Sequence, residues 1–179
     1  MSILPQQSVP PLQIETVHDG IWDLQAQSPD QFTMLVFYRG LHCPICKDYL
    51  STLKKSLDAL KEQGVEAIAI SSDSKERAKK AAEEWKLKGL KIGFEFPLHK
   101  ANEWGLFVSG ELAPSKSKEI SEPPQFLEPG LFLVDAGGKL YASSVQSMPF
   151  ARPPIDGIVK AVTFIREKAY PARGQAIAL

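Results

Sequence analysis

A dense apolar run that leads through two cysteines into a long helical pattern constrains the fold of this chain more than any other feature. The run extends from Phe32 to Tyr38 between Asp30 and Gly40; it is too short for a helix and typical of a strand buried on both faces. The helical pattern is one apolar stripe with spacings of four and three residues: Cys46, Leu50, Leu53, Leu57 and Leu60. Gly64 follows at the C′ position, so the sequence predicts a single helix that ends there.

Strand and helix patterns alternate along the rest of the chain. The strand patterns are a second buried run, Val65 to Ile70, a short extended piece, Phe94 to Leu98, an N-terminal hairpin, Leu12 to Val17 with Ile21-Trp22, and a late hairpin, Leu131 to Val134 with Lys139 to Val145. The helix patterns are one capped by Asp73 that buries Ala78, Ala81, Ala82 and Trp85, a small one around Ala101 to Trp104, and a last one that buries Ile155, Ile158, Val159, Val162 and Ile165. This order predicts an α/β fold: a central mixed β-sheet flanked by helices on both faces, with an N-terminal β-hairpin extension.

One long segment lacks any periodicity. It extends from about Phe107 to Glu128 and contains Pro114, Pro123 and Pro124. Irregular stretches of this length inside a compact domain are usually functional or mobile rather than incidental. We therefore expect this segment to take part in the choice of substrate.

Length and charge restrict the class of protein. A chain of 179 residues fits a single domain spanning residues 1–179, and its 21 basic and 21 acidic residues cancel. This balance removes the electrostatic case for a nucleic-acid or membrane-surface partner. The longest unbroken apolar run, Met34 to Tyr38, is far too short to span a bilayer, and the N-terminal residues lack the basic and apolar regions of a signal peptide. We expect a cytoplasmic protein with no nucleic-acid and no membrane partner.

The two cysteines of the chain, Cys43 and Cys46, stand at the start of the predicted helix, separated by Pro44 and Ile45. If Cys43 is the N-cap, Pro44 occupies the first helical position, and the N–H groups of Ile45 and Cys46 point toward the Cys43 sulfur. The helix dipole and amide donors lower the pKa of such a cysteine from about 8.5 to about 3.5–7.5, which makes it nucleophilic near neutral pH. Cys46 lies on the buried stripe, within reach of a mixed disulfide or a sulfenic acid on Cys43. The motif predicts that Cys43 attacks and Cys46 resolves.

Two other interpretations of the cysteines stay open. Cys43, Cys46 and His42 are potential zinc ligands, although only His18 and His99 remain as further imidazoles to complete a tetrahedral site. The cysteines could also be inert core residues, against which the proline at the first helical position argues. We expect neither a metal nor a cofactor.

Two arginines are candidates to stabilise a thiolate or a peroxide oxygen. Arg39 stands four residues before Cys43, and Arg152 stands just before the Pro153-Pro154 pair. Either one could instead be an ordinary surface charge, and Arg152 is the weaker candidate. His42 is expected to tune the thiolate or to lie exposed.

Four segments of the chain carry a family resemblance. They are Phe37 to Cys46 (FYRGLHCPIC), Ala67 to Asp73 (AIAISSD), Phe96-Pro97-Leu98, and Gly130 to Asp135 (GLFLVD). In this order they resemble the alkyl hydroperoxide reductase and thiol-specific antioxidant family of peroxiredoxin-like proteins. The resemblance covers about residues 10 to 170 and implies a thioredoxin-like fold, with the redox cysteine at the N-terminus of the helix after the first core strand. It also implies thiol-dependent redox chemistry, either peroxide reduction or dithiol–disulfide exchange.

The sequence departs from that family at three positions. Gly40 and Val36 stand where the family's Pro-x-x-x-Thr-x-x-Cys motif has threonine and proline, and Pro129 stands where the family has an arginine. Because thioredoxins place a cis-proline before the equivalent strand, the resemblance implies that the Glu128–Pro129 peptide is cis and that Pro129 faces Cys43. The chain thus resembles a peroxiredoxin-like body that carries a thioredoxin-type C-P-I-C active site.

These features lead to three functional hypotheses. The first is a thiol–disulfide oxidoreductase in which Cys43 and Cys46 cycle between dithiol and disulfide, Pro129 shapes the substrate groove and Arg39 supports the thiolate. The second is a thiol-dependent peroxidase in which Cys43 becomes a sulfenic acid that Cys46 resolves. The third is a non-catalytic thioredoxin-fold binding module that uses the 107–128 segment as its contact surface.

The two enzyme hypotheses imply particular partners. The substrate is a peroxide or a protein disulfide, and the reductant is a thioredoxin-type, glutaredoxin-type or low-molecular-weight thiol. A homodimer is possible, with the Trp22 hairpin and the proline-rich C-terminal tail as contact surfaces.

Overall fold

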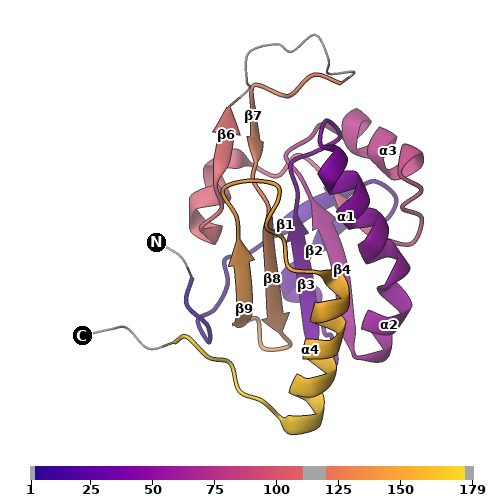
Figure 1. The fold of residues 1–179 in the computed structure, drawn as a ribbon. Helices are drawn as coiled ribbons and strands as arrows, with labels where there is room; N and C mark the ends of the chain where they lie inside the picture. The colour runs from indigo at the N-terminus through magenta and orange to yellow at the C-terminus, as the bar shows by residue number, and fades with distance from the viewer. Residues whose placement is uncertain (1–2, 111–119, 176–179) are drawn as a thin grey trace.

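A seven-stranded mixed sheet runs through the centre of the computed structural model, which describes residues 3–110 and 120–175. Its strand order is β2-β1-β5-β4-β3-β8-β9 (Figure 1). The strands are β1 (Gln13–Thr16), β2 (Gly20–Asp23), β3 (Phe32–Phe37), β4 (Val65–Ile70), β5 (Lys91–Gly93), β8 (Gly130–Asp135) and β9 (Leu140–Val145). Strands β3, β4 and β5 are parallel to one another, and the other neighbouring pairs are antiparallel. The predicted mixed sheet is confirmed.

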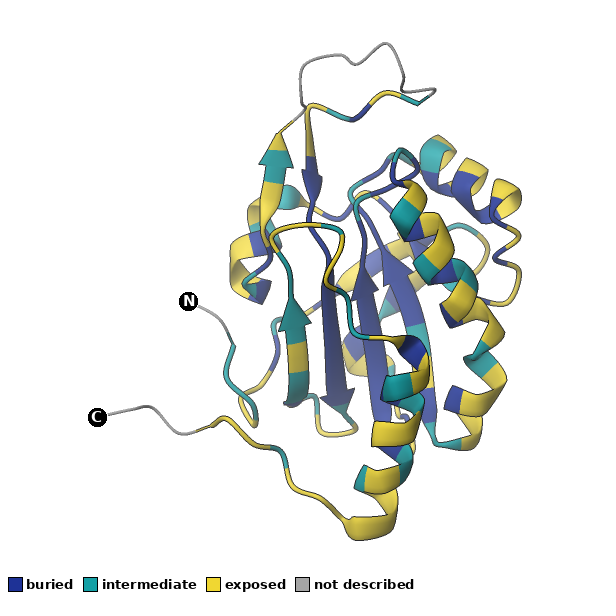
Figure 2. Ribbon diagram, in the orientation of Figure 1, coloured by how far each residue is buried: buried dark blue, intermediate teal, exposed yellow. Residues whose placement is uncertain are grey.

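The α-helices and a 3-10 helix cover the two faces of this sheet. Helices α1 (Pro44–Lys55), α2 (Leu57–Glu62), α3 (Lys75–Glu84) and α4 (Ile155–Lys168) share one buried cluster with Met34 and Val36 of β3. The 3-10 helix η2 (Leu98–Trp104) and the N-terminal segment share a second cluster with Leu35 and Phe37. Because side chains alternate along a strand, β3 contributes to both clusters and is buried throughout (Figure 2). Among the described residues, no helix is long and apolar enough to cross a membrane.

The helix predicted to follow the cysteines is in fact two helices. Ser56, which separates α1 from α2, has φ −97° and ψ 1°. Its hydroxyl donates a hydrogen bond to the Thr52 carbonyl at 3.2 Å, and its backbone N–H is shared among carbonyls of the preceding turn. Such local bonding competes with the regular helical ladder, so the helix breaks here while the apolar stripe continues to Leu60. Gly64, with φ +76°, follows the end of α2 as predicted.

Two predicted element boundaries are also wrong. Ser74 rather than Asp73 caps α3, by accepting from the Arg77 N–H, because the Asp73 side chain is buried in another contact. The short extended piece expected to begin at Phe94 lies earlier, since residues 91–93 form β5 by pairing with β4.

The segment predicted to be irregular begins and ends as a strand. Strands β6 (Val108–Gly110) and β7 (Gln125–Leu127) pair in antiparallel fashion and form a second, two-stranded sheet (Figure 1). Residues 111–119, which include Pro114, lie outside the described residues. The sequence does not predict this pairing, because neither strand is long enough to show the alternation of apolar and polar residues that marks a strand.

The N-terminal hairpin is confirmed, and it extends the sheet because β1 pairs with β5. Trp22 is buried in the second cluster and only 7% exposed, so the prediction that it offers an exposed surface for a dimer is wrong. Its neighbour Ile21 points to the other side of the strand and is 76% exposed.

Residues 6–9 lie along the opposite edge of the sheet. Ser8 pairs with Lys139, the Gln6 N–H donates to the Leu140 carbonyl at 2.7 Å, and the Val9 N–H donates to the Gly138 carbonyl at 3.0 Å. The segment from residue 6 to residue 16 therefore bonds to two strands that lie far apart in the sheet. Residues 6–9 bond at the start of β9, and Thr16 of β1 pairs with Gly93 of β5, with β4, β3 and β8 in between.

Candidate active site

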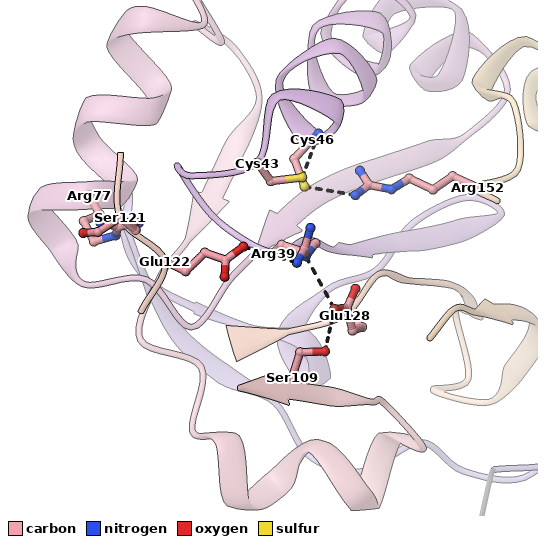
Figure 3. A network of polar contacts seen from close by, with 9 residues as sticks. All are labelled: Arg39, Cys43, Cys46, Arg77, Ser109, Ser121, Glu122, Glu128 and Arg152. Carbon is pink, nitrogen blue, oxygen red and sulfur yellow. Dashed lines mark hydrogen bonds and ion pairs between the residues drawn. The ribbon is translucent and has the colours of Figure 1, made fainter. Parts of the chain in front are cut away.

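Cys43 is the N-cap of α1, as the sequence predicts. Its backbone is extended (φ −104°, ψ 103°), Pro44 opens the helix, and the Cys43 Sγ accepts a hydrogen bond from the Cys46 N–H at 3.3 Å (Figure 3). Since proline has no N–H to offer and suits the first helical position, the helix begins without loss at the residue after the cysteine. Of the first-turn amides predicted to face the sulfur, the Cys46 N–H does so.

The two thiols are free, buried and in contact with each other. Cys43 is 2% exposed and Cys46 is fully buried. A hydrogen bond from the Cys46 side chain, opposed by burial and aided by the Cys46 N–H and the charges of Arg152 and Arg39, lowers the pKa of Cys43 to about 6. Burial, followed by the hydrogen bond and charge of Cys43, raises the pKa of Cys46 well above its ordinary value. These opposite directions favour a thiolate on Cys43 and a retained proton on Cys46.

Alkylation of the reduced protein by iodoacetamide should follow the ionisation of Cys43. Because the thiolate is the reactive form, the rate should rise as the pH increases through about 6 and level off above it. In Cys46→Ser, whose hydroxyl can still donate, the midpoint should stay close to this value; in Cys46→Ala, which has no donor, it should rise. A midpoint near the free-thiol value of about 8.5 in the wild type would contradict this assignment.

A buried carboxylate fixes the loop that precedes Cys43. Asp73 accepts hydrogen bonds from the Leu41 N–H at 2.7 Å and from Arg77 Nε at 2.9 Å. Gly40 has φ +127°, and a Cβ built on it would lie 2.6 Å from the Asp73 carboxylate oxygens. Position 40 has no room for a side chain, which explains why glycine stands there.

Arg39, the first predicted supporting residue, lies in a cluster of acidic and aromatic side chains. Its guanidinium forms ion pairs with Glu128, at 3.5 Å from Nε to Oε1, and with Glu122, at 3.8 Å from Nη2 to Oε1 (Figure 3). It also stacks over the Phe126 ring at 4.7 Å. Its charge lowers the pKa of Cys43, but less than that of Arg152 does.

Arg152 is closer to the cysteines than the sequence suggested. Its Nη2 donates a hydrogen bond to the Cys46 Sγ at 3.0 Å (Figure 3). Arg152 lies in the loop between β9 and α4, 106 residues after Cys46, and no motif or spacing links the two in the sequence. Its one sequence signal was a cation set beside prolines in an otherwise apolar stretch.

The Glu128–Pro129 peptide is not cis, so that prediction is wrong: residues 3–110 and 120–175 contain no cis peptide bond. The Glu128 N–H continues the β6–β7 pairing by donating to the Phe107 carbonyl, and the chain stays extended into β8 in the ordinary trans form. Pro129 lines a small pocket together with Tyr49 and Arg152, and neither cysteine is among its lining residues. That Pro129 faces Cys43 stays a prediction.

The histidines do not gather around the cysteines as zinc ligands. The His42 ring packs against Phe126, with 4.6 Å between the ring centroids. Within the described part of the chain, no group of three or more His, Cys, Asp or Glu side chains is arranged to hold a metal ion.

A dithiol at the start of the helix that follows the central strand of a mixed sheet defines a thioredoxin-fold thiol oxidoreductase. The chain belongs to the AhpC/TSA family, whose model matches residues 5–143. As a member of this family, it is a thiol-dependent oxidoreductase.

Solved structures share the fold at low sequence identity. Peroxidoxin BcpB from Mycobacterium tuberculosis is 15% identical with a TM-score of 0.67, and the match covers 92% of this chain and 97% of that one. The reduced 2-Cys peroxiredoxin of Plasmodium vivax is 17% identical (TM-score 0.70, 93% and 83% covered). AhpC from Enterococcus faecalis is 14% identical (TM-score 0.70, 97% and 99% covered). A search of curated proteins found no match.

Proposed function

We propose that the protein is a thiol–disulfide oxidoreductase in which Cys43 and Cys46 cycle between a dithiol and a disulfide. The observation that carries this proposal is the opposite shift of the two thiol pKa values within one hydrogen-bonded pair. A nucleophile must be ionised to attack, and a resolving thiol must keep its proton until the first bond has formed. The directions of the two pKa shifts support both conditions.

The first step uses Cys43 alone. The Cys43 thiolate attacks one sulfur of a substrate disulfide, an S–S bond forms between Cys43 and the substrate, and the other substrate sulfur leaves as a thiolate. Cys46 then loses its proton to the leaving group or to water and attacks the Cys43 sulfur. The second substrate thiolate leaves, so the substrate gains two electrons and the protein holds a Cys43–Cys46 disulfide. An external thiol, either a thioredoxin-type or glutaredoxin-type protein or a small thiol, returns the protein to its reduced state.

A peroxidase is the second candidate, and the burial of Cys43 favours it. A sulfur that is 2% exposed is reached more easily by a small peroxide than by a folded protein. The Cys43 thiolate would attack one peroxide oxygen, the O–O bond would break, and water or an alcohol would leave with the electrons and a proton. Attack by Cys46 on the resulting sulfenic acid would release water and give the same disulfide. The names of the matching structures, peroxiredoxins and AhpC, agree with this candidate.

Rapid-quench measurements with two oxidants separate these candidates. Fully reduced wild type and Cys46→Ser are mixed with one equivalent of hydrogen peroxide or of a small disulfide, and thiol loss is compared with that of the unfolded chain. We expect the disulfide to consume both thiols of the wild type and to leave a mixed disulfide on Cys43 in Cys46→Ser.

Each outcome decides between the candidates. Thiol loss with peroxide that is orders of magnitude faster than in the unfolded chain, with a sulfenic acid trapped on Cys43, makes the protein a peroxidase. Loss no faster than the unfolded chain leaves disulfide exchange as the function. If the protein reacts with neither oxidant, the dithiol cycle is wrong, and the non-catalytic binding module becomes the remaining hypothesis.

A further inference from the structure

We propose that Arg152 is a catalytic residue of the second half of the cycle, where it activates the resolving Cys46 after Cys43 has reacted. This inference rests on the proposed function and adds to it a residue from outside the family match. Arg152 lies beyond residues 5–143, in the loop between β9 and α4.

Contacts on both sides of Arg152 fix its guanidinium beside Cys46. Nη2 lies 3.0 Å from the Cys46 Sγ (Figure 3). The guanidinium also lies over the Tyr49 ring, at 5.2 Å from the ring centroid. The Tyr49 hydroxyl donates to the carbonyl of the next residue, Pro153, at 2.7 Å. Since Tyr49 and Cys46 stand three residues apart on α1, the same helix holds both the loop and the sulfur.

The charge of Arg152 is less compensated than that of Arg39. Arg39 is paired with Glu122 and Glu128, whereas among the described residues no carboxylate lies within ion-pair distance of Arg152. In the same part of the chain, Nε and Nη1 of Arg152 are buried without a hydrogen-bond partner. The positive charge of Arg152 therefore acts on the two thiols and on the neighbouring Tyr49 hydroxyl, with no described carboxylate to offset it.

The groups that face Cys46 come from three elements. Cys43 stands at the start of α1, Arg152 comes from the β9–α4 loop, and Tyr38 follows the end of β3. Burial raises the pKa of Tyr38, so its phenol stays neutral throughout the working range of pH. The charges that change or persist around Cys46 are therefore those of Cys43 and Arg152.

Reaction at Cys43 changes the balance between these two charges. In the reduced protein the Cys43 thiolate opposes ionisation of Cys46, and Arg152 favours it. A mixed disulfide or a sulfenic acid on Cys43 carries no such negative charge, so burial alone then opposes the effect of Arg152 on the ionisation of Cys46. The Cys46 proton passes to water or to the leaving group, the Cys46 thiolate forms the S–S bond with Cys43, and the group bound to Cys43 leaves with the electron pair of the bond that breaks. Cys46 thereby becomes a nucleophile only after Cys43 carries a mixed disulfide or a sulfenic acid.

The ionisation of Cys46 can be measured with Cys43 held neutral. In Cys43→Ser the one remaining thiol is Cys46, and its thiolate absorbance in the ultraviolet is followed against pH, with Cys43→Ser/Cys46→Ser as the blank. We expect its midpoint to lie below the second thiol midpoint of the wild type. Adding Arg152→Gln should raise the midpoint by about one pH unit or more, equivalent to a tenfold loss of thiolate.

Matched variants separate the charge of Arg152 from its packing. Arg152→Lys, which keeps the charge, should restore most of the shift, and Arg39→Gln in the same background should move the midpoint little. Circular dichroism checks each fold, and Arg152→Met, which keeps the contact with Tyr49, replaces the glutamine variant if that one is unfolded. An unchanged midpoint without the Arg152 charge, or an equal rise with Arg39→Gln, would overturn the inference.

Kinetics give a second test in the complete protein. In Arg152→Gln the conversion of a Cys43 mixed disulfide to the Cys43–Cys46 disulfide at neutral pH should slow by roughly threefold or more, since a higher pKa lowers the thiolate fraction but partly raises its nucleophilicity. Conversion at the wild-type rate would contradict the inference. A failure of the proposed function can be told apart from a failure of this inference. If the wild type forms no Cys43–Cys46 disulfide, the proposed function is wrong, whereas the titration of Cys46 needs no oxidant and still tests the effect of Arg152.

Discussion

Cys43→Ser should slow the reaction of the protein with any disulfide or peroxide by at least about 10³-fold, because a serine hydroxyl in the same place is not ionised at neutral pH. Cys46 does not replace the lost nucleophile, because it is fully buried. Rapid-quench thiol loss under pseudo-first-order conditions measures the effect directly.

Cys46→Ser is the matched control for this prediction. It removes the same number of sulfur atoms but leaves Cys43 with its amide donor and a hydroxyl neighbour. The first step should therefore proceed, and the reaction should stop at a Cys43 adduct without forming an intramolecular disulfide. If Cys43→Ser instead retains the full biological activity of the wild type, the protein is a binding module and the dithiol has no catalytic part.

Asp73→Ala should lower the free energy of unfolding by about 2–4 kcal/mol, as expected when a buried hydrogen-bonded carboxylate is removed. The Leu41 N–H would be left without its buried acceptor, and Arg77 would lose the carboxylate with which it forms an ion pair just before the start of α3. The loop from Gly40 to Cys43 would also lose the group that its backbone packs against. Urea denaturation measures the loss, and the reactivity of Cys43 should fall with it.

Asp73→Asn tests how much of this loss in the free energy of unfolding comes from the negative charge of the carboxylate. The amide oxygen can still accept from one donor, so the asparagine variant should lose clearly less stability than the alanine variant. If Asp73→Ala costs no more than about 0.5 kcal/mol, the size of an ordinary surface substitution, Asp73 does not fix the loop.

The parts of this molecule that the sequence predicts well are those whose causes are local. The β3 run, the N-cap position of Cys43 and the late hairpin follow from apolar spacing, a proline at the first helical position and a Gly-Gly turn. The break at Ser56 escaped because a hydroxyl bond to the previous turn leaves no trace in the spacing of apolar residues.

The parts that escaped depend on contacts between distant segments. Asp73 has the residue type and the sequence position of an N-cap. Its carboxylate is instead a buried hydrogen-bond acceptor, because the loop with Leu41, 32 residues earlier, packs against it. Arg152 reaches Cys46 because the loop between β9 and α4 passes the first turn of α1, which no pattern near residue 152 reveals. The expected cis-proline came from a resemblance, and the pairing of Glu128 with Phe107 keeps the chain extended instead.

The N-terminal segment has a consequence for the order in which the molecule assembles. Residues 6–9 bond to residues 138–140, so they can dock only after β8 and β9 have joined the sheet. The loop closed by this contact contains more than 120 residues. The conformational entropy lost when it closes is offset only by contacts among the strands in between, so these strands must be in place first. Until then residues 138–140, at the start of β9, expose unpaired backbone groups that can pair with another chain. Refolding at high protein concentration should therefore favour aggregates joined at this edge, and productive folding needs the N-terminal segment to close over it after β8 and β9 have paired.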